Sequence, residues 1–243
     1  MKNNIYSTSL RIDACSRQST PLGAVGRGRG HSISALLVAL LLTLTAHGAP
    51  YGFKSFMNID GLSDNRVLCA MQDSYGFMWL GTANGLNCFD GHHNIVYRNM
   101  VSNGTAFQNN LITSLFEQDG DVWFGGEFGL YVYHRADNSF TRFDARTRYG
   151  VPISSTVDRM ARTQNGLIWI CTQGQGLFLY DPATGTLTQD SRHNGFISDM
   201  TIASDGLVYL VSLDGQLLVY NQEGHYQRQY EVPDFVVERT RCA

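Results

Sequence analysis

Few side chains in this 243-residue sequence are grouped in a way that could carry out chemistry. The adjacent histidines His92 and His93 could supply two ligands to a metal ion, but they follow the turn dipeptide Asp90-Gly91. Adjacent side chains of a strand point to opposite faces, and no third ligand stands near them at a metal-binding spacing. We therefore expect two solvated histidines in a turn and no metal site.

Nucleophilic and phosphate-binding chemistry also finds little support. Asp190, Ser191 and His193 are the residue types of a catalytic triad, but they crowd into four residues of a polar loop, whereas triad members meet from separate parts of a fold. The string Gly174-Gln-Gly176 is predicted to be a hairpin turn, because no helix follows that could hold a phosphate at its N-terminus. We predict no catalytic residue and no cofactor.

Three aromatic residues, Tyr75, Phe128 and Tyr149, are the candidates for stacking against a sugar or another small molecule. Such residues are more often ordinary packing between strands. If loops of the fold bind a ligand, an oligosaccharide or another small molecule is the expected one.

The first 49 residues differ in charge from the rest of the chain. They hold five of the 18 basic residues and one of the 21 acidic residues, so the remainder carries about seven more acidic than basic groups, which argues against a nucleic-acid partner. An uncharged apolar run spans residues 33–45, about 20 Å as a helix against roughly 30 Å of membrane hydrocarbon. Residues 1–49 are predicted to be a signal peptide, with an N-terminal anchor as the alternative.

Four cysteines follow the leader, Cys69, Cys88, Cys171 and Cys242, without a C-x-x-C spacing. A bridge between Cys69 and Cys88 is conceivable in an oxidising compartment. Isolated buried thiols in strands are the favoured interpretation.

A repeat of about 40 residues organises the chain after the leader. Its three tryptophans are spaced 44 and 46 residues apart, a tyrosine takes the same position in a fourth copy, and a turn glycine stands three residues before each. An aliphatic residue stands nine residues before each glycine. These positions are Trp79, Trp123, Trp169 and Tyr209; Gly76, Gly120, Gly166 and Gly206; and Val67, Leu111, Val157 and Ile197.

Each copy resolves into short β segments separated by turns. In the first copy we expect strands at 66–72, 77–82, 86–90 and 95–98. A unit of four strands in 40 to 50 residues has the length of a β-propeller blade, and no helical period runs for more than two turns. We predict an all-β protein with four-stranded antiparallel blades at about 60–100, 108–145, 151–190 and 195–231 in a domain spanning 50–243, with the tryptophans packed between adjacent sheets.

The first copy resembles the two-component regulator propeller repeat. The residues that carry the resemblance are Gly61-Leu62-Ser63-Asp64-Asn65-x-Val67 and Gln72-Asp73-x-x-Gly76-Phe77-x-Trp79-Leu80-Gly81-Thr82-x-x-Gly85-Leu86. The third copy departs from the pattern, because Cys171 stands where glycine is usual, and the fourth lacks the tryptophan. The resemblance implies the periplasmic sensor region of hybrid two-component systems, in which further blades, a membrane helix and a histidine kinase follow, with a dimer as a further expectation for full-length relatives.

The expected function is a periplasmic sensory or ligand-binding propeller module that responds to a glycan or another extracytoplasmic signal. It would be a truncated N-terminal part of a sensor histidine kinase, without the kinase domain and hence not an enzyme, and in contact with the membrane only through the leader or a downstream helix. With four blades we expect an open arc with exposed edges or a strained closure. The alternatives are a secreted propeller enzyme acting on polysaccharide, a lyase or glycosidase, and a protein-interaction scaffold.

Overall fold

The computed structural model describes residues 55–98, 109–190, 192 and 196–231, which fall in one compact unit that begins at Ser55. The predicted leader at 1–49, the triad residue types Ser191 and His193, and Cys242 lie outside the described residues. Within the described part, no helix is long and apolar enough to cross a membrane.

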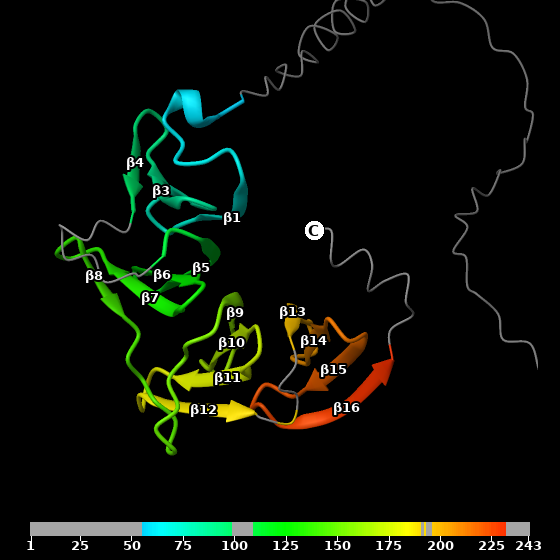
Figure 1. Cartoon of the computed structure of the whole chain (residues 1–243). Helices are drawn as coiled ribbons and strands as arrows, with labels where there is room; N and C mark the ends of the chain where they lie inside the picture. Colours follow the sequence, from blue (N-terminus) through cyan, green and yellow to red (C-terminus); the bar gives the residue numbers. More distant parts are fainter. Residues whose placement is uncertain (1–54, 99–108, 191, 193–195, 232–243) are drawn as a thin grey trace, which may run out of the picture. The chain divides into compact units, whose positions relative to one another are not determined.

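The described residues form four antiparallel sheets of four strands, each paired in chain order (Figure 1). The strands are β1 (Val67–Gln72), β2 (Met78–Thr82), β3 (Gly85–Phe89) and β4 (Asn94–Tyr97); β5 (Ile112–Gln118), β6 (Asp121–Gly126), β7 (Gly129–His134) and β8 (Ser139–Arg142); β9 (Val157–Arg162), β10 (Ile168–Thr172), β11 (Gly176–Asp181) and β12 (Thr186–Asp190); and β13 (Ile197–Ile202), β14 (Val208–Ser212), β15 (Gln216–Tyr220) and β16 (Tyr226–Glu231). A short 3-10 turn, η1 (Asn58–Asp60), precedes them. The four strands of the first copy begin and end within one residue of their predicted bounds.

The first hairpin turn is shorter in the second sheet than in the others. Sheets one, three and four use a four-residue turn closed by the turn glycine, as in the bond of 3.0 Å from Gly76 N to the Asp73 carbonyl. The second sheet uses Asp119-Gly120 alone, both with positive φ, the backbone of a two-residue hairpin turn. The prediction that Leu111 is the aliphatic residue of the second copy is therefore wrong by one residue. Ile112 takes that position and begins the strand.

A β-bulge recurs at the second residue of each sheet's first strand. The pairing shifts between Val67 and Cys69, and again at the same place in β5, β9 and β13, which leaves Leu68, Thr113, Asp158 and Ser198 opposite no single partner. A bulge increases local twist, and neighbouring sheets of a stack must be twisted to fit together. The sequence gives no direct sign of this feature.

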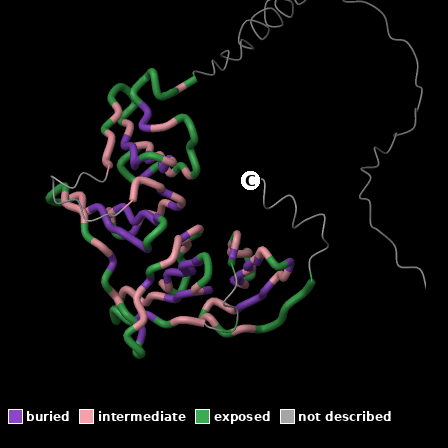
Figure 2. The backbone as a smooth tube through the Cα atoms, viewed as in Figure 1, coloured by how far each residue is buried: buried purple, intermediate pink, exposed green. Residues whose placement is uncertain are grey.

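Hydrophobic side chains fill the spaces between consecutive sheets. Figure 2 shows that buried residues recur in each of the four sheets. Trp79 lies in the core between sheets one and two, Trp123 in the core between sheets two and three, and Trp169 in the core between sheets three and four. All three are buried, whereas Tyr209 is half-buried. Each tryptophan contacts the ring of the tyrosine on the third strand of the next sheet, Tyr133, Tyr180 or Tyr220.

Consecutive sheets fit together through one small residue and one large residue. A Cβ atom built on Gly81 would lie 2.7 Å from Cγ2 of Ile112, and one on Gly125 would lie 2.8 Å from Cβ of Val157. The glycine two residues after Trp79 and Trp123 therefore makes room for the first residue of the next sheet. Cys171, the next residue of this series, is fully buried in the same core as Ile197, so a thiol also fits there.

Candidate functional site

The three aromatic residues proposed as ligand contacts are exposed but lie apart. Tyr75 is 63% exposed in the β1–β2 turn, Phe128 43% in the β6–β7 turn and Tyr149 77% in the β8–β9 connection. Because consecutive strands run in opposite directions, the turns that hold Tyr75 and Phe128 lie at opposite ends of the strands. The structure therefore does not gather these residues into one site.

The core between sheets one and two is closed at its edge by an ion pair. Asp73 accepts a hydrogen bond of 2.8 Å from Trp79 Nε1 and a contact from the Arg135 guanidinium, which lies 4.3 Å over the Tyr75 ring. Burial opposes the charged carboxylate, but the hydrogen bonds from Trp79, Phe77 and Arg135 outweigh it and lower the pKa of Asp73. Arginine, carboxylate and aromatic rings together cover this edge.

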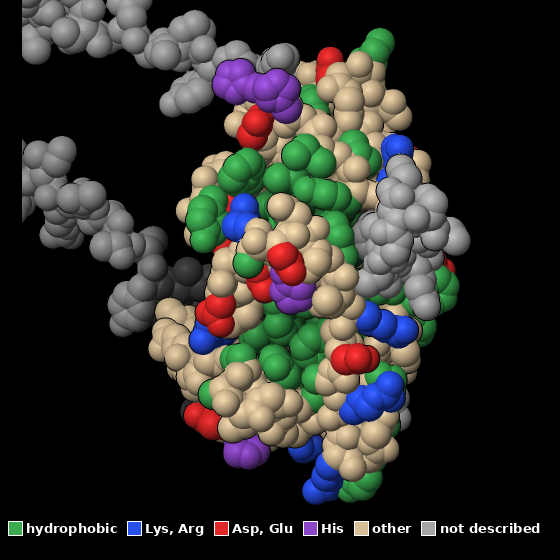
Figure 3. All heavy atoms as spheres, turned by 90° about the vertical axis from the view of Figure 1, so that its left-hand side faces the viewer, with side chains coloured by type: hydrophobic (Ala, Val, Ile, Leu, Met, Phe, Trp, Pro, Cys, Tyr) green, Lys and Arg blue, Asp and Glu red, His purple; other side chains and the backbone are tan. Residues whose placement is uncertain are grey.

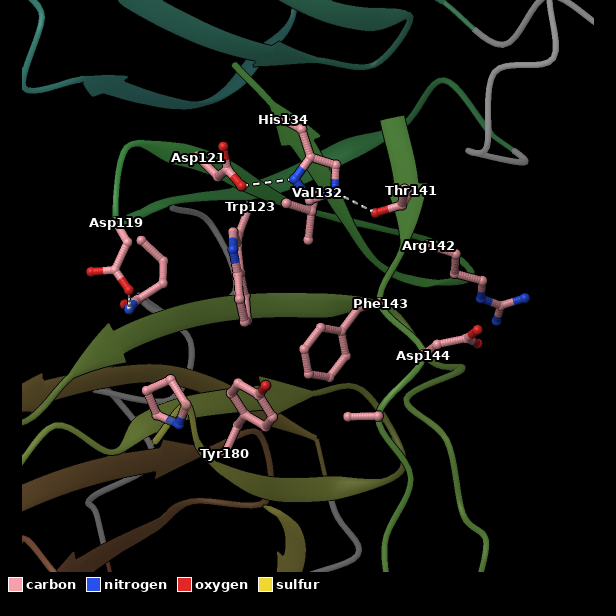
Figure 4. Close-up of a pocket in the computed structure, with 13 residues that line it drawn as sticks. Asp119, Asp121, Trp123, Val132, His134, Thr141, Arg142, Phe143, Asp144 and Tyr180 are labelled. Atoms are coloured by element: carbon pink, nitrogen blue, oxygen red, sulfur yellow. Dashed lines mark hydrogen bonds and ion pairs between the residues drawn. The ribbon is translucent and has the colours of Figure 1, made fainter. Parts of the chain in front are cut away.

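The matching edge between sheets two and three is open. Pro182 takes the position of Arg135, because each stands six residues after the first residue of its third strand. Gln118 takes the position of Asp73, because each stands two residues after the strand partner of its tryptophan. A cavity of about 410 Å³ lies there, which we call the inter-sheet groove (Figure 4). Loss of the covering arginine explains why this edge has a groove.

Aromatic side chains form the floor of the inter-sheet groove. Trp123, Phe143 and Tyr180 point into the space between the two sheets (Figure 4), with ring centroids 5.0 Å apart for Trp123–Phe143 and for Phe143–Tyr180. Figure 3 shows this side of the molecule, where hydrophobic side chains gather in a hollow beside a histidine and acidic groups. Such a floor suits the apolar face of a ring.

Polar groups in a fixed arrangement form the rim. His134 Nδ1 lies 2.7 Å from Asp121 Oδ2, and His134 Nε2 lies 2.8 Å from Thr141 Oγ1, on three adjacent strands. With a neutral ring, the Asp121 carboxylate accepts from Nδ1–H, so Nε2 accepts from the Thr141 hydroxyl. Both ring nitrogens are thus engaged, which holds the imidazole at the groove.

The remaining rim residues make the groove acidic. Asp119 and Asp144 join Asp121 in its lining, together with Arg142, which donates to the Phe128 carbonyl at 3.0 Å, and Arg162 Nη1 lies 3.7 Å from Asp119 Oδ1. The Asp119 side chain is 78% exposed. The groove thus offers carboxylates to the hydroxyl or cationic groups of a ligand.

Sequence reasoning missed the inter-sheet groove. Tryptophan spacing placed Trp123 correctly between sheets, but the groove depends on neighbours from β7, β8 and β11. One signal was available, namely the change from Arg135 to Pro182 at equivalent positions of consecutive repeats. That change is visible only when the copies are aligned on their third strands.

The other predicted chemical groups have structural explanations. Asp90 accepts hydrogen bonds from the backbone N–H groups of His93 and His92, at 2.6 and 2.7 Å, and these bonds lower the pKa of Asp90 to about 2. Within the described residues, no three histidine, cysteine, aspartate or glutamate side chains are grouped as metal ligands. Asp190 accepts from the Tyr220 hydroxyl at 3.0 Å.

The three described cysteines are free thiols. Burial raises the pKa of Cys69 to about 12 and that of Cys88 to about 11, and it raises the pKa of Cys171 further. Buried thiols of this kind react slowly, because the thiolate is the reactive form. The alternative of a Cys69–Cys88 bridge is therefore wrong for this structure.

Comparison with solved structures confirms a propeller arrangement. The extracellular domain assigned to a hybrid two component system of B. thetaiotaomicron matches with a TM-score of 0.64 and 23% identity, over 74% of this chain and 26% of that domain's chain. The extracellular domain assigned to a one component system of the same organism matches with a TM-score of 0.56 and 22% identity, over 68% of this chain and 22% of the other. The fold defines a protein of β-propeller blades.

The first copy of the repeat matches the two-component regulator propeller repeat. The model of the family described as two component regulator propeller matches residues 61–84, which span the turn glycine, the tryptophan and the Gly81-Thr82 pair of the first sheet. Histidine kinase P4 of Formosa agariphila is 45% identical over 67 residues. Those residues are 28% of this chain and 5% of the kinase, so the chain spans a small part of that relative.

Proposed function

We propose that this chain is part of the extracytoplasmic sensory propeller of a two-component sensor, and that the inter-sheet groove binds a small polar ligand with an apolar face, such as a sugar. The repeat match at residues 61–84 and the identity to a histidine kinase support the sensory role. A ligand can bias a coupled kinase only by binding one conformation of its sensor more tightly than another.

The observation that carries the ligand proposal is the pairing of an aromatic floor with a polar rim. Ligand pockets range from about 300 to 1,000 Å³ and combine apolar walls with a few fixed polar groups. The groove's cavity of about 410 Å³ falls in that range and suits one or two sugar rings. Trp123, Phe143 and Tyr180 would meet the ring face, and the exposed carboxylate of Asp119 would meet hydroxyl groups, while His134 holds Asp121 and Thr141 in place at the rim.

Calorimetric titration of the full chain with neutral di- and hexasaccharides of glucose, mannose, xylose and arabinose tests this site. We expect at least one sugar to bind, and His134→Ala to weaken it about tenfold, because the imidazole that holds Asp121 and Thr141 at the rim is lost. His93→Ala is the matched control, because His93 also pairs with an aspartate, Asp90, but lies outside the groove.

A second variant tests the groove by filling it. Pro182→Arg places an arginine at the position that Arg135 occupies in the first interface, and Asp119 and Asp121 are there to pair with it. We expect this variant to fold and to lose ligand binding. If no sugar binds the wild type, or if Pro182→Arg and His134→Ala bind as well as His93→Ala does, the inter-sheet groove is not the site.

Export is the second part of the proposal. Alkaline phosphatase is active only outside the bacterial cytoplasm, so a fusion after residue 231 should be active in whole cells. Deleting residues 1–49 should abolish that activity without reducing the amount of fusion protein. An active fusion without residues 1–49, or an inactive fusion with them, would contradict the predicted leader.

A polysaccharide-degrading enzyme is the second candidate function. The three carboxylates of the groove lining, Asp119, Asp121 and Asp144, favour it, because a glycosidase uses a pair of carboxyl groups as general acid and as base or nucleophile; His134 pairs with Asp121. Incubation of the full chain with each ligand, followed by assay of new reducing ends, separates the two candidates. Binding without cleavage identifies a sensory site, whereas cleavage lost in His134→Ala identifies an enzyme.

A further inference from the structure

The connection between β8 and β9 forms a small hairpin at the outer edge of the third sheet. Arg146 pairs with Pro152 across it, and Thr147 forms a parallel bridge with Leu187 of β12. At its tip, Gly150 N donates to the Thr147 carbonyl at 2.8 Å, and Val151 N donates to Thr147 Oγ1 at 3.1 Å. Figure 1 shows this connection passing β12 on its way from β8 to β9.

The hairpin has a structural role on its inner side. Phe143 and Ile153 at its two ends pack in one core cluster with Leu187, which is buried although β12 is the outermost strand of its sheet. An uncovered edge strand can pair with another chain, so this cover protects the sheet. Packing explains the apolar residues of the hairpin, but it does not explain the residues at its tip.

A cavity of about 670 Å³ lies between the hairpin tip and β12, and we call it the edge pocket. Its walls carry two arginines, an exposed tyrosine, three threonines and a glutamine, and no carboxylate. The residues are Arg146, Thr147, Arg148, Tyr149, Gly185, Thr186, Leu187, Thr188 and Gln189. In a chain with a net charge of −3, two guanidinium groups in a lining that holds no carboxylate mark a positive site.

The two guanidinium groups are available to a ligand. Arg146 Nη1 donates to the Gly150 carbonyl at 3.3 Å, and neither Arg146 nor Arg148 makes an ion pair with a carboxylate within the described residues. Arg148 Cζ lies 4.6 Å from the centre of the Tyr149 ring. This stacking orders the guanidinium while leaving its N–H groups toward solvent.

We propose that the edge pocket binds an acidic saccharide, whose carboxylate or sulfate groups pair with Arg146 and Arg148 while a sugar ring packs on Tyr149. Arginine presents its N–H groups in a planar fork that matches a planar or tetrahedral oxyanion. Thr186 and Gln189 line the same cavity, and their polar side chains can also hydrogen-bond to sugar hydroxyls. This site is separate from the inter-sheet groove, whose lining holds three aspartates and one arginine.

Titration of the full chain with four probes tests the proposal: trigalacturonic acid, a sulfated chondroitin disaccharide, maltotriose and sodium sulfate. We expect at least one of the acidic sugars to bind, with an affinity that falls as salt rises, and maltotriose to leave the edge pocket empty. The double variant Arg146→Gln/Arg148→Gln should weaken the acidic sugar tenfold or more, because two charged hydrogen-bond donors are removed.

Arg228→Gln is the matched control, because Arg228 also stacks on an exposed tyrosine, Tyr230, at 5.5 Å, on β16. If Arg228→Gln still binds the acidic sugar and the double variant does not, the result supports the edge pocket. This holds whether the bound oxyanion is a carboxylate or a sulfate group. The proposal is overturned if neither acidic sugar binds, or if Arg228→Gln weakens binding as much as the double variant does. It is also overturned if sodium sulfate binds as tightly as the sugars and Tyr149→Ala changes nothing.

A result in the edge pocket is distinguishable from one in the inter-sheet groove. His134→Ala should leave binding of the acidic sugar unchanged, and Arg146→Gln/Arg148→Gln should leave binding of a neutral sugar unchanged. Loss of acidic-sugar binding in His134→Ala would assign that ligand to the groove and overturn the edge pocket.

Discussion

The repeat tryptophans occupy equivalent positions but differ in one hydrogen bond. Trp79 Nε1 donates to Asp73 at 2.8 Å, whereas Trp169 Nε1 is buried with no hydrogen-bond partner within the described residues. A buried polar group without a partner costs about 1–3 kcal/mol. The same indole therefore stabilises the first interface through a bond that it lacks in the third.

Replacing each of these tryptophans with phenylalanine measures the difference. Both changes remove the same volume, but Trp79→Phe also removes a partner from the Asp73 carboxylate, and Trp169→Phe removes an unsatisfied N–H. We expect Trp79→Phe to lower the free energy of unfolding by about 1–3 kcal/mol more than Trp169→Phe does. Urea denaturation followed by circular dichroism checks this, and equal losses would show that the Trp79–Asp73 bond contributes nothing.

Asp73 also gives the protein a defined response to acid. Its pKa in the folded protein lies below the ordinary value of 3.8, so the stabilisation is complete at pH above the unfolded pKa and is lost as pH falls through the folded pKa. Asp73→Asn removes this contribution. The gap in unfolding free energy between wild type and Asp73→Asn should therefore shrink from pH 7 to pH 3, and a gap that is constant or grows would refute the assignment.

At the scale of the element, adjacent sheets depend on the contact between a small and a large residue. Adding a Cβ to Gly81 brings it 2.4 Å from Cys69 Sγ and 2.7 Å from Ile112 Cγ2, distances that real Cβ atoms do not show. We expect Gly81→Ala to cost about 1–3 kcal/mol by overpacking. Gly76→Ala is the control, because its Cβ meets nothing within 4 Å and its cost is the positive φ alone.

A double-mutant cycle identifies the contact partner in this interface. Ile112→Ala alone leaves a cavity, but it also makes room for the new methyl group of Gly81→Ala. The double variant should therefore be more stable than the sum of the two single losses predicts, by at least about 0.5 kcal/mol. Additive losses in urea denaturation would mean that Ile112 is not what limits the space at Gly81.

The sequence predicted the strands better than it predicted the surfaces between them. Strand bounds in the first copy came within one residue, because alternating apolar residues and turn glycines are local signals. Leu111 was misplaced because the turn at Asp119-Gly120 is shorter than its counterparts. The groove and the edge pocket could not be predicted, because each joins residues from neighbouring sheets or from a connection that folds back on β12.

At the scale of the whole molecule, the described sheets contact one another in chain order. First strands contact first strands, β1 with β5, β5 with β9 and β9 with β13, so each sheet depends on its neighbours for buried area. The first sheet shows the consequence at one end. Val67 is 43% exposed, whereas its counterparts Ile112, Val157 and Ile197 are buried by the preceding sheet.

Cysteine labelling can follow the opening of this stack at two places. Cys69 lies against the core between sheets one and two, and Cys171 lies fully buried between sheets three and four. Burial raises the pKa of Cys69 to about 12, which keeps this thiol in its unreactive, protonated form at pH 8. Cys171 has the additional barrier that no reagent reaches it without separation of the sheets.

Two variants, each with one of these cysteines and serine at the other four cysteine positions, give the measurement. In native buffer at pH 8 both should react with a disulfide reagent far more slowly than they do in 8 M urea, and Cys171 should react no faster than the chain unfolds. Because the sheets bury one another, moderate urea should raise both rates together. If Cys171 reacts in native buffer as fast as in the unfolded chain, the interface between sheets three and four is not closed. If moderate urea raises the labelling rate of Cys69 but not that of Cys171, the first interface opens by itself.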